Sequence, residues 1–456
     1  GCDTPLREKY FIYFMPAGMK LCEAYSALPT GGTHMDKTLG IYIHIPFCAS
    51  KCGYCDFYSL AGCDRLMPKY QDALVEHIRE SYGAMKSYYI DTVYFGGGTP
   101  SYYGADRLIE LWDELRGSGR VLKSSEVTVE ANPDSANFKE LEKLRKAGFN
   151  RVSLGVQSAN NDILKLIGRR HNWKQVEMAV EAVRDAGFDN LSIDLIYGLP
   201  SQTKSDWADT LMRAIDLRPE HVSCYGLTLE EGTPMYKYKG SPFLPSDDEQ
   251  ADMYLYASDM LEHYGYSQYE ISNFAIKGFE SRHNMRYWKL EEYLGFGAGA
   301  HSCMGGARFS YVKDADRYII GVLRDLNIVD EYERITPVER ASEYIMLGMR
   351  TAHGIDGEEY TRLYRSDFRP LGQTLEEFAK KGWAYKKDDG RWRFTSSGFL
   401  LSNLLIGALL EAQSGSRVAV NPWMKEAFDA EEKTELPPDD EELFRDMYMK
   451  GNRREQ

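Results

Sequence analysis

Three cysteines form the clearest chemical motif in the sequence. Cys48, Cys52 and Cys55 have the spacing CxxxCxxC. Clustering of this kind in a large chain indicates metal binding more than disulfide formation. Three thiolates can bind three irons of a [4Fe–4S] cluster, and no fourth cysteine follows closely, since Phe57 comes two residues later and the next cysteine is Cys63. One iron would stay open, able to chelate the amino and carboxylate groups of S-adenosylmethionine (SAM) and to pass one electron to its sulfonium.

The same cysteines could instead hold zinc or be three buried thiols. Zinc sites usually combine close pairs of ligands from two distant segments, and the sequence has no second CxxC and no HxxxH. His44 could join the cysteines, although its position two residues before Pro46 makes the geometry awkward. We expect the remaining cysteines to be buried apolar residues or bystanders, namely Cys2, Cys22, Cys63, Cys224 and Cys303.

Length, charge and hydropathy narrow the class of protein. A chain of 456 residues exceeds one ordinary core, so we expect a large domain and at least one smaller one. The formal net charge of −14 argues against nucleic acid as a partner. No apolar run reaches the ~18–20 residues that span a bilayer, and the longest candidate, Phe11–Met19, is short and contains Pro16. We therefore expect a cytoplasmic protein.

Six β-rich runs alternate with amphipathic helical patterns from Ile41 onward, and Tyr70–Tyr82, Phe138–Ala147 and Trp173–Ala186 are typical of the helices. The predicted strands are Ile41–Pro46, Thr92–Phe95, Val127–Glu130, Val152–Val156, Leu191–Ile196 and Val222–Leu227. This alternation predicts a parallel sheet with right-handed crossovers. Six units are fewer than the eight of a closed barrel, so the expected fold class is α/β, a partial (β/α)6 barrel.

The alternation of strands and helices stops after the sixth strand, and the rest of the chain can be divided into segments by composition. Lys387–Arg391 contains Asp-Gly and predicts the turn of a hairpin among the C-terminal helices. The predicted segments are an N-terminal arm, disordered or artefactual (1–39), a partial barrel (40–235), a barrel extension (236–335), a C-terminal α+β domain resembling a winged helix (336–413) and an acidic tail (414–456).

Polar residues stand where several predicted strands end. Gly96–Pro100, with the sequence GGGTP, follows the second strand, and Glu130, Gln157 and Asp194 end or follow the next three. The carboxyl ends of parallel strands meet at one edge, so we expect these residues to converge on a pocket beside the cysteines. Each alone could be a turn, a helix cap or a solvated strand end.

The motifs together resemble a known family. The sequence IHIPF leading into the cysteines, GGGTP, EANP from Glu130, GVQS from Gly155 and DLIYGLP from Asp194 occur in the order found in the radical SAM family of oxygen-independent coproporphyrinogen III oxidases and their relatives. The resemblance runs from about residue 40 to about residue 412.

Three features resemble the heme chaperones of this family more than its true oxidases. Phe57 stands where the oxidases have a further cysteine, and residues 1–39 do not resemble their substrate-covering segment. In addition, His283, Asn284, Tyr287 and Trp288 match the HNxxYW pattern that is associated with heme binding.

The resemblance implies roles for the matched positions. Cys48, Cys52 and Cys55 would ligate the [4Fe–4S] cluster, and no catalytic residue is assigned. The residues that would bind SAM are Tyr42, Tyr54, Gly97, Gly98, Thr99, Glu130, Gln157, Arg169 and Asp194. His283 would be the axial ligand of heme, with Tyr287 and Trp288 on the porphyrin face, and His301 is a second candidate ligand.

The leading functional hypothesis is a heme chaperone that transfers heme to an acceptor hemoprotein, which we expect to be a respiratory one, with the cluster and SAM in a regulatory or structural role. The alternatives are an oxygen-independent coproporphyrinogen III oxidase, or a radical SAM enzyme acting on another tetrapyrrole. Radical chemistry would need an electron donor such as flavodoxin or ferredoxin. A homodimer and a transient contact with a membrane protein are further partners compatible with the resemblance.

Overall fold

The computed structural model describes residues 37–415. The expected N-terminal arm and acidic tail therefore lie, except for residues 37–39 and 414–415, outside the described residues. Within the described range no helix is both long and apolar enough to cross a membrane.

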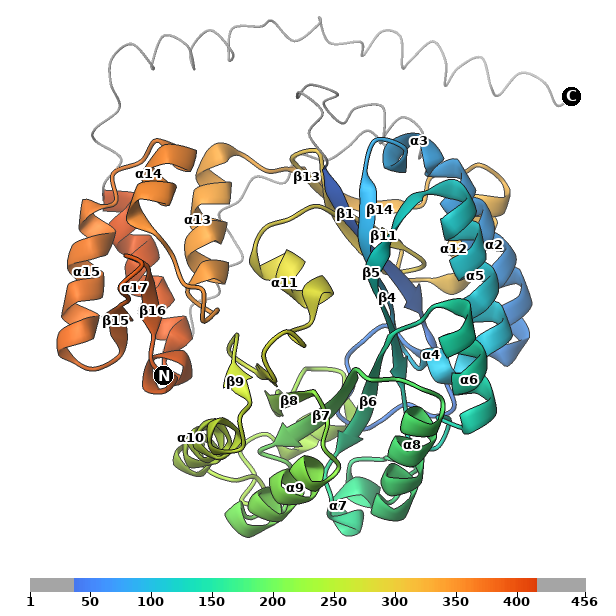
Figure 1. The fold of residues 1–456 in the computed structure, drawn as a ribbon, viewed down its shortest axis with the longest axis horizontal. Helices are drawn as coiled ribbons and strands as arrows, with labels where there is room; N and C mark the ends of the chain where they lie inside the picture. Colours follow the sequence, from blue (N-terminus) through green and yellow to red (C-terminus); the bar gives the residue numbers. More distant parts are fainter. Residues whose placement is uncertain (1–36, 416–456) are drawn as a thin grey trace, which may run out of the picture.

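Six parallel strands, adjacent in chain order, form the centre of a 12-stranded sheet. They are β1 (Thr38–Ile45), β4 (Tyr89–Gly97), β5 (Arg120–Ala131), β6 (Arg151–Gln157), β7 (Leu191–Tyr197) and β8 (His221–Gly226). The helices between them cover the outer face of the curved sheet (Figure 1): α2 (Met67–Glu80), α3 (Tyr82–Met85), α4 (Pro100–Tyr103), α5 (Ala105–Ser118), α6 (Phe138–Ala147), α7 (Asn161–Leu166), α8 (Trp173–Asp185) and α9 (Lys204–Asp216). This arrangement confirms the predicted partial (β/α)6 barrel.

Local sequence explains why these elements form where they do. All seven residues of β6 are buried, as expected of a parallel strand covered on both faces. Helix α6 begins at the side-chain cap of Asn137 and ends at Gly148, whose φ of 115° is the left-handed conformation of a helix C-terminus. Gly187 plays the same part after α8, with a φ of 88°.

The segment after β8 extends both edges of the sheet. Its elements are η2 (Pro234–Tyr238), α10 (Asp247–His263), β9 (Ser267–Gln268), β10 (Asn273–Ala275), α11 (Arg282–Trp288), β11 (Tyr293–Phe296), β12 (His301–Met304), β13 (Ala307–Tyr311), α12 (Ala315–Leu323) and β14 (Val329–Arg334). Strand β10 pairs antiparallel with β8 at one edge, and β11 pairs parallel with β1 at the other. The chain must therefore cross the open side of the barrel between β10 and β11, and α11 lies on this crossing (Figure 1).

The C-terminal unit has a hydrophobic core separate from that of the barrel, built around residues such as Ile345, Leu371 and Trp392. It comprises α13 (Pro337–Gly348), α14 (Gly357–Tyr364), α15 (Arg369–Lys380), β15 (Ala384–Lys386), β16 (Trp392–Phe394), α16 (Ser396–Leu400) and α17 (Ser402–Gly415). β15 and β16 pair antiparallel around the predicted turn, where Gly390 has a φ of 84°. A backbone bridge between Glu270 and Thr351 joins this unit to the barrel extension.

Candidate functional site

A cavity of about 560 Å³ lies on the concave side of the sheet, beside the cysteine loop. Of the residues expected to hold the cluster or SAM, every one except Tyr42 lines it: Cys48, Cys52, Tyr54, Cys55, Gly97, Gly98, Thr99, Glu130, Gln157, Arg169 and Asp194. Residues from β2 (Phe47–Cys48), β4, β5, β6 and β7 and from the loops between them thus meet in one place, which we call the central cavity.

The cysteine loop begins at the short strand β2 (Phe47–Cys48), which pairs with β3 (Leu60–Ala61); the 3-10 helix η1 (Asp64–Leu66) follows. The Thr99 hydroxyl donates to Cys48 Sγ at 3.3 Å, and Arg169 Nη1 lies 3.6 Å from Cys52 Sγ. Burial raises the pKa of the Cys48 and Cys55 thiols. Bare thiolates are therefore disfavoured here, and binding to a cation would stabilise them.

The residues fit a cubane cluster better than a single metal ion. No group of three His, Cys, Asp or Glu side chains in residues 37–415 converges as one ion would require. In a [4Fe–4S] cluster each thiolate binds its own iron, so the sulfurs stand apart around a shared space. Cys48, Cys52 and Cys55 are all half-buried and face the central cavity, as that arrangement requires.

The glycine turn after β4 holds the cysteine loop in place. Gly98 N donates to Ile45 O at 2.8 Å, and Thr99 N donates to Phe47 O at 2.9 Å. A Cβ on Gly98 would lie 2.7–2.8 Å from backbone atoms of residues 45–47, so only glycine allows this approach. Gly97 N donates to Glu130 Oε2 at 3.0 Å. The three amides of this turn are therefore used within the protein, and Thr99 O accepts from Tyr102 N at 2.9 Å. A backbone contact with a ligand would therefore fall to the carbonyl oxygens of Gly97 and Gly98.

Two half-buried carboxylates lie on β5 and β7, on either side of β6. Glu130 accepts hydrogen bonds from the Tyr94 hydroxyl at 2.9 Å and from Gly97 N, and burial raises its pKa to about 7. Asp194 accepts from Ser223 Oγ at 2.7 Å and from Ser153 Oγ at 3.0 Å, and burial raises its pKa as well. Both carboxylates are oriented by their partners before any ligand arrives.

Arg169 and Gln157 also line the central cavity. Arg169 Nη2 donates to Asn132 Oδ1 at 2.7 Å and to Gly155 O, while its Nε is buried without a partner. Gln157 has a φ of 69°, and a register shift between Gly155 and Gln157 turns the end of β6 toward the cavity. An arginine with an unused donor beside the cysteines suits a ligand carboxylate.

Two other expected residues lie elsewhere. Tyr42 does not line the central cavity: its hydroxyl is hydrogen-bonded to His44 Nδ1 at 2.9 Å, and its ring stacks against Tyr94 at 6.2 Å. His301 is an exposed residue at the start of β12 and lines neither of the cavities described here.

The HNxxYW residues divide between two environments. His283 is 1% exposed, and both ring nitrogens are occupied: Nδ1 lies 2.9 Å from Thr92 Oγ1 and Nε2 lies 2.7 Å from the Tyr287 hydroxyl. Burial lowers the pKa of His283 to about 3, so the ring is neutral. Tyr287 and Trp288 instead line a second cavity of about 530 Å³ between α11 and the C-terminal unit, which we call the interdomain cavity. Asn284 lines both this cavity and the central cavity.

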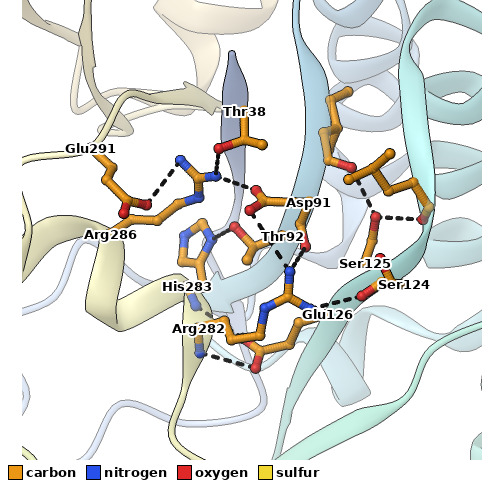
Figure 2. Close-up of polar contacts among 12 residues, drawn as sticks. Thr38, Asp91, Thr92, Ser124, Ser125, Glu126, Arg282, His283, Arg286 and Glu291 are labelled. Carbon is orange, nitrogen blue, oxygen red and sulfur yellow. Dashed lines mark hydrogen bonds and ion pairs between the residues drawn. The ribbon is translucent and has the colours of Figure 1, made fainter. Parts of the chain in front are cut away.

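A network of polar contacts fixes α11 on the barrel (Figure 2). Glu126 on β5 accepts from the backbone amides of Arg282 and His283, both at 3.0 Å, at the positive end of the helix. The buried guanidinium of Arg286 pairs with Asp91 and donates to Thr38 Oγ1 at 2.8 Å. The motif helix is thus held by β1, β4 and β5 together.

Sequence reasoning missed several residues of the central cavity. Arg151 lines it, is 1% exposed and leaves its Nε without a hydrogen-bond partner. Arg151, Ser153, Gly155 and Gln157 occupy alternate positions of β6 and all line the cavity. The two-residue period of a strand could have identified this face once Gln157 was assigned to the pocket.

Comparisons with known proteins agree with the geometry. The profile of the Radical SAM superfamily matches residues 42–214, and that of the HemN C-terminal domain matches residues 335–401. The chain is 36% identical over 376 residues to the heme chaperone HemW of Bacillus subtilis (strain 168), covering 81% of this chain and 98% of that protein. It is 31% identical over 382 residues to the heme chaperone HemW of Escherichia coli (strain K12), covering 82% and 98%.

Among solved structures, coproporphyrinogen III oxidase (HemN) from Escherichia coli, described as a radical SAM enzyme, aligns with a TM-score of 0.74. The alignment covers 85% of this chain and 92% of that chain at 23% identity. At that identity the likeness shows the fold alone.

Proposed function

The chain belongs to the heme chaperone HemW family of radical SAM proteins, and from this premise we propose that it binds heme and transfers it to an acceptor hemoprotein. The observation that supports the proposal most is the presence of two adjoining cavities, whose linings share Tyr225 and Asn284. One is lined by the cysteines and the residues expected to bind SAM, and the other by Tyr287 and Trp288 of the HNxxYW motif. A protein that carries heme beside a SAM-binding cluster needs two such spaces.

Cys48, Cys52 and Cys55 are the proposed ligands of the [4Fe–4S] cluster. When bound, the cluster supplies an electron to the sulfonium of SAM. Arg169 has donors to spare for the SAM carboxylate, because its Nε is buried without a partner. Glu130 and Asp194 can accept hydrogen bonds from the ribose hydroxyls. The carbonyl oxygens of Gly97 and Gly98 are suited to the amino group of SAM, which is a donor.

His283 remains the proposed axial ligand of heme, provided that the Tyr287 hydroxyl leaves its Nε2 atom. Its Nε2 is bonded to the Tyr287 hydroxyl at 2.7 Å, so iron must displace that hydroxyl. Its Nδ1 can keep the bond to Thr92, which fixes the ring and is the second partner that an imidazole ligand needs. Tyr287 and Trp288 then offer their rings to the porphyrin face.

An active coproporphyrinogen III oxidase is the second candidate function. It is favoured by one observation, the presence beside the cysteines of all the expected SAM-binding residues except Tyr42. Against it, Phe57 stands in place of the extra cysteine and is 66% exposed. We therefore propose a chaperone rather than an active oxidase. An electron donor of the flavodoxin or ferredoxin type, a homodimer, a respiratory acceptor and contact with a membrane protein belong to the same proposal.

Anaerobic reconstitution of the full chain with iron and sulfide, followed by heme titration and a product assay, tests the proposal. We expect stable binding of heme, and no protoporphyrinogen from coproporphyrinogen III with SAM and a reductant. Formation of protoporphyrinogen with SAM cleaved in step would assign the oxidase activity instead. Absence of heme binding by the reconstituted protein would reject the chaperone function.

A further inference from the structure

The interdomain cavity lies between the barrel with its extension and the C-terminal unit. Its walls come from α11, from the segment around β10, from β11 to β13, and from α13 with the residues that follow it. In Figure 1, α11 lies between the sheet and the C-terminal helices, and α13 is the helix that faces it. A volume of about 530 Å³ is within the range of pockets that hold sizeable ligands.

Aromatic side chains dominate one side of this cavity. Tyr225, Tyr287, Trp288 and Tyr293 all line it. The ring of Tyr293 packs edge-on against that of Tyr287 at 4.6 Å, which fixes both rings. Flat, rigid aromatic surfaces of this kind favour a large planar ligand.

Three arginines line the same cavity. Arg340 and Arg350 project from α13 and the turn after it, and Arg308 comes from β13. Arg308 and Arg340 share the carboxylate of Glu343, at 2.6 and 3.1 Å. Glu333 also pairs with the exposed end of Arg308, at 2.7 Å, so two carboxylates balance these two arginines and the uncompensated positive charge of the cavity lies on Arg350.

Arg350 has no carboxylate partner among residues 37–415. Its Nη2 donates to Asn403 Oδ1 at 2.8 Å, its Nε is buried without a partner, and burial alone acts on its pKa. A half-buried cation without a counter-charge is costly unless a ligand supplies one.

The acidic residues of the cavity do not cancel this charge. Glu291 is directed to Arg286, 3.5 Å away on the far side of α11. Glu270 is buried, accepts from Ser272 N at 3.2 Å and has a pKa raised to about 7, so near neutral pH it is not a full negative charge.

We propose that the interdomain cavity is the heme site, with the heme propionates bound by Arg350 and Arg340 and the ring lying against Tyr287 and Trp288. This assignment rests on the proposed function as a heme chaperone. Guanidinium groups bind carboxylates with paired, charge-assisted hydrogen bonds, which selects a ligand with carboxylates on its rim. Arg340 and Arg350 belong to the C-terminal unit, whereas Tyr287 and Trp288 belong to the barrel extension. Movement of α13 away from α11 would therefore open the site for transfer of heme.

Substitution of the arginines in the full chain, combined with removal of the propionate charges from the ligand, tests the assignment. The probes are ferric protoporphyrin IX and its dimethyl ester, in which both propionates are uncharged, and the measurement is the dissociation constant from absorbance titration. The variants are Arg350→Gln, Arg350→Lys and Arg340→Gln. Arg362→Gln, which replaces an exposed arginine of α14, is the matched control. Circular dichroism and the cluster absorbance check that each variant is folded.

We expect Arg350→Gln and Arg340→Gln each to weaken binding of the free acid by roughly 10- to 100-fold, as for the loss of a charged hydrogen bond, and to change binding of the ester by less than about twofold. Arg350→Lys keeps the charge and should lie between Arg350→Gln and the unaltered protein, and Arg362→Gln should have no effect. Equal losses of affinity for acid and ester, or no loss of affinity in either variant, would overturn the assignment of the heme site. The chaperone function would still stand in that case, provided that the unaltered protein binds heme. If the unaltered protein bound neither probe, both proposals would fail together.

Discussion

The Tyr287 hydroxyl lies 2.7 Å from His283 Nε2 and connects the interior of the barrel to the interdomain cavity. Tyr287 lines that cavity, whereas His283 is buried against β4. The two residues are one helical turn apart, so α11 itself sets their distance. The Nε2 atom of the proposed heme ligand is therefore occupied by a hydrogen bond that heme binding must break.

This relationship predicts opposite effects of substitution at the two positions. His283→Ala should weaken heme binding by at least about tenfold, because it removes the ligand. Tyr287→Phe keeps the ring but frees Nε2 of a competing bond of roughly 1 kcal/mol, so heme affinity should be retained or rise up to about fivefold. Absorbance titration measures both. If Tyr287→Phe lost heme as completely as His283→Ala, ligation by His283 would be rejected in favour of a role for the hydroxyl.

Replacing Cys48, Cys52 and Cys55 together by alanine should abolish the visible absorbance of the reconstituted cluster and its bound iron and sulfide. Among the cysteines of residues 37–415, only these three line the central cavity. Cys63→Ala is the control, because its thiol contacts the Ala61 carbonyl at 3.7 Å outside that cavity. Cluster absorbance that persists in the triple variant, or disappears in the control, would disprove the ligand assignment.

Breaking the ion pair under α11 should destabilise the protein strongly. The Arg286 side chain is 1% exposed, so Asp91→Asn leaves a buried cation with only the partial compensation of Glu291. We expect a loss of about 3 kcal/mol in the free energy of unfolding, measured by urea denaturation. Arg282→Gln is the comparison: its guanidinium is 48% exposed and lies 3.7 Å from Asp91, so the loss there should be below about 1 kcal/mol. Similar losses for both would mean that burial does not set the strength of this network.

The buried carboxyl of Glu270 should make stability depend on pH. Burial raises its pKa from 4.5 to about 7, so the folded state holds the proton more tightly than the unfolded state. The contribution of this group to the free energy of unfolding is complete below pH ~4.5. It declines as the pH rises to ~7, by a total on the order of 3 kcal/mol at most. Glu270→Gln removes this dependence and should become more stable than the unaltered protein above pH ~7.

The measurement for Glu270→Gln is the difference in unfolding free energy between variant and unaltered protein from pH 4.5 to 8. Glu358→Gln, at an exposed carboxylate of α14, serves as the control and should show a flat difference. A flat difference for Glu270→Gln as well would mean that this carboxyl ionises normally in the folded protein.

Much of the barrel follows from local patterns. The apolar runs of β1 and β6, the Asn137 cap and the Gly148 terminus of α6 depend only on nearby residues, and their period and type are visible in the sequence. The same is true of the CxxxCxxC loop and of the strand ends that line the central cavity, because the carboxyl ends of parallel strands must meet. Arg151 was missed because a charged residue inside a buried strand departs from that pattern.

What the sequence determined by itself was therefore the α/β class, the cysteine motif and most residues of the central cavity. Only the tertiary structure decided where α11 lies and which way its residues point. His283 meets Thr92, 191 residues away, and its amide meets Glu126, 157 residues away. Contacts across such separations depend on how β10 and β11 pair with opposite edges of the sheet, which no local period encodes. For that reason His283 turned out to be buried, and the arginines of the interdomain cavity came into view only with the fold.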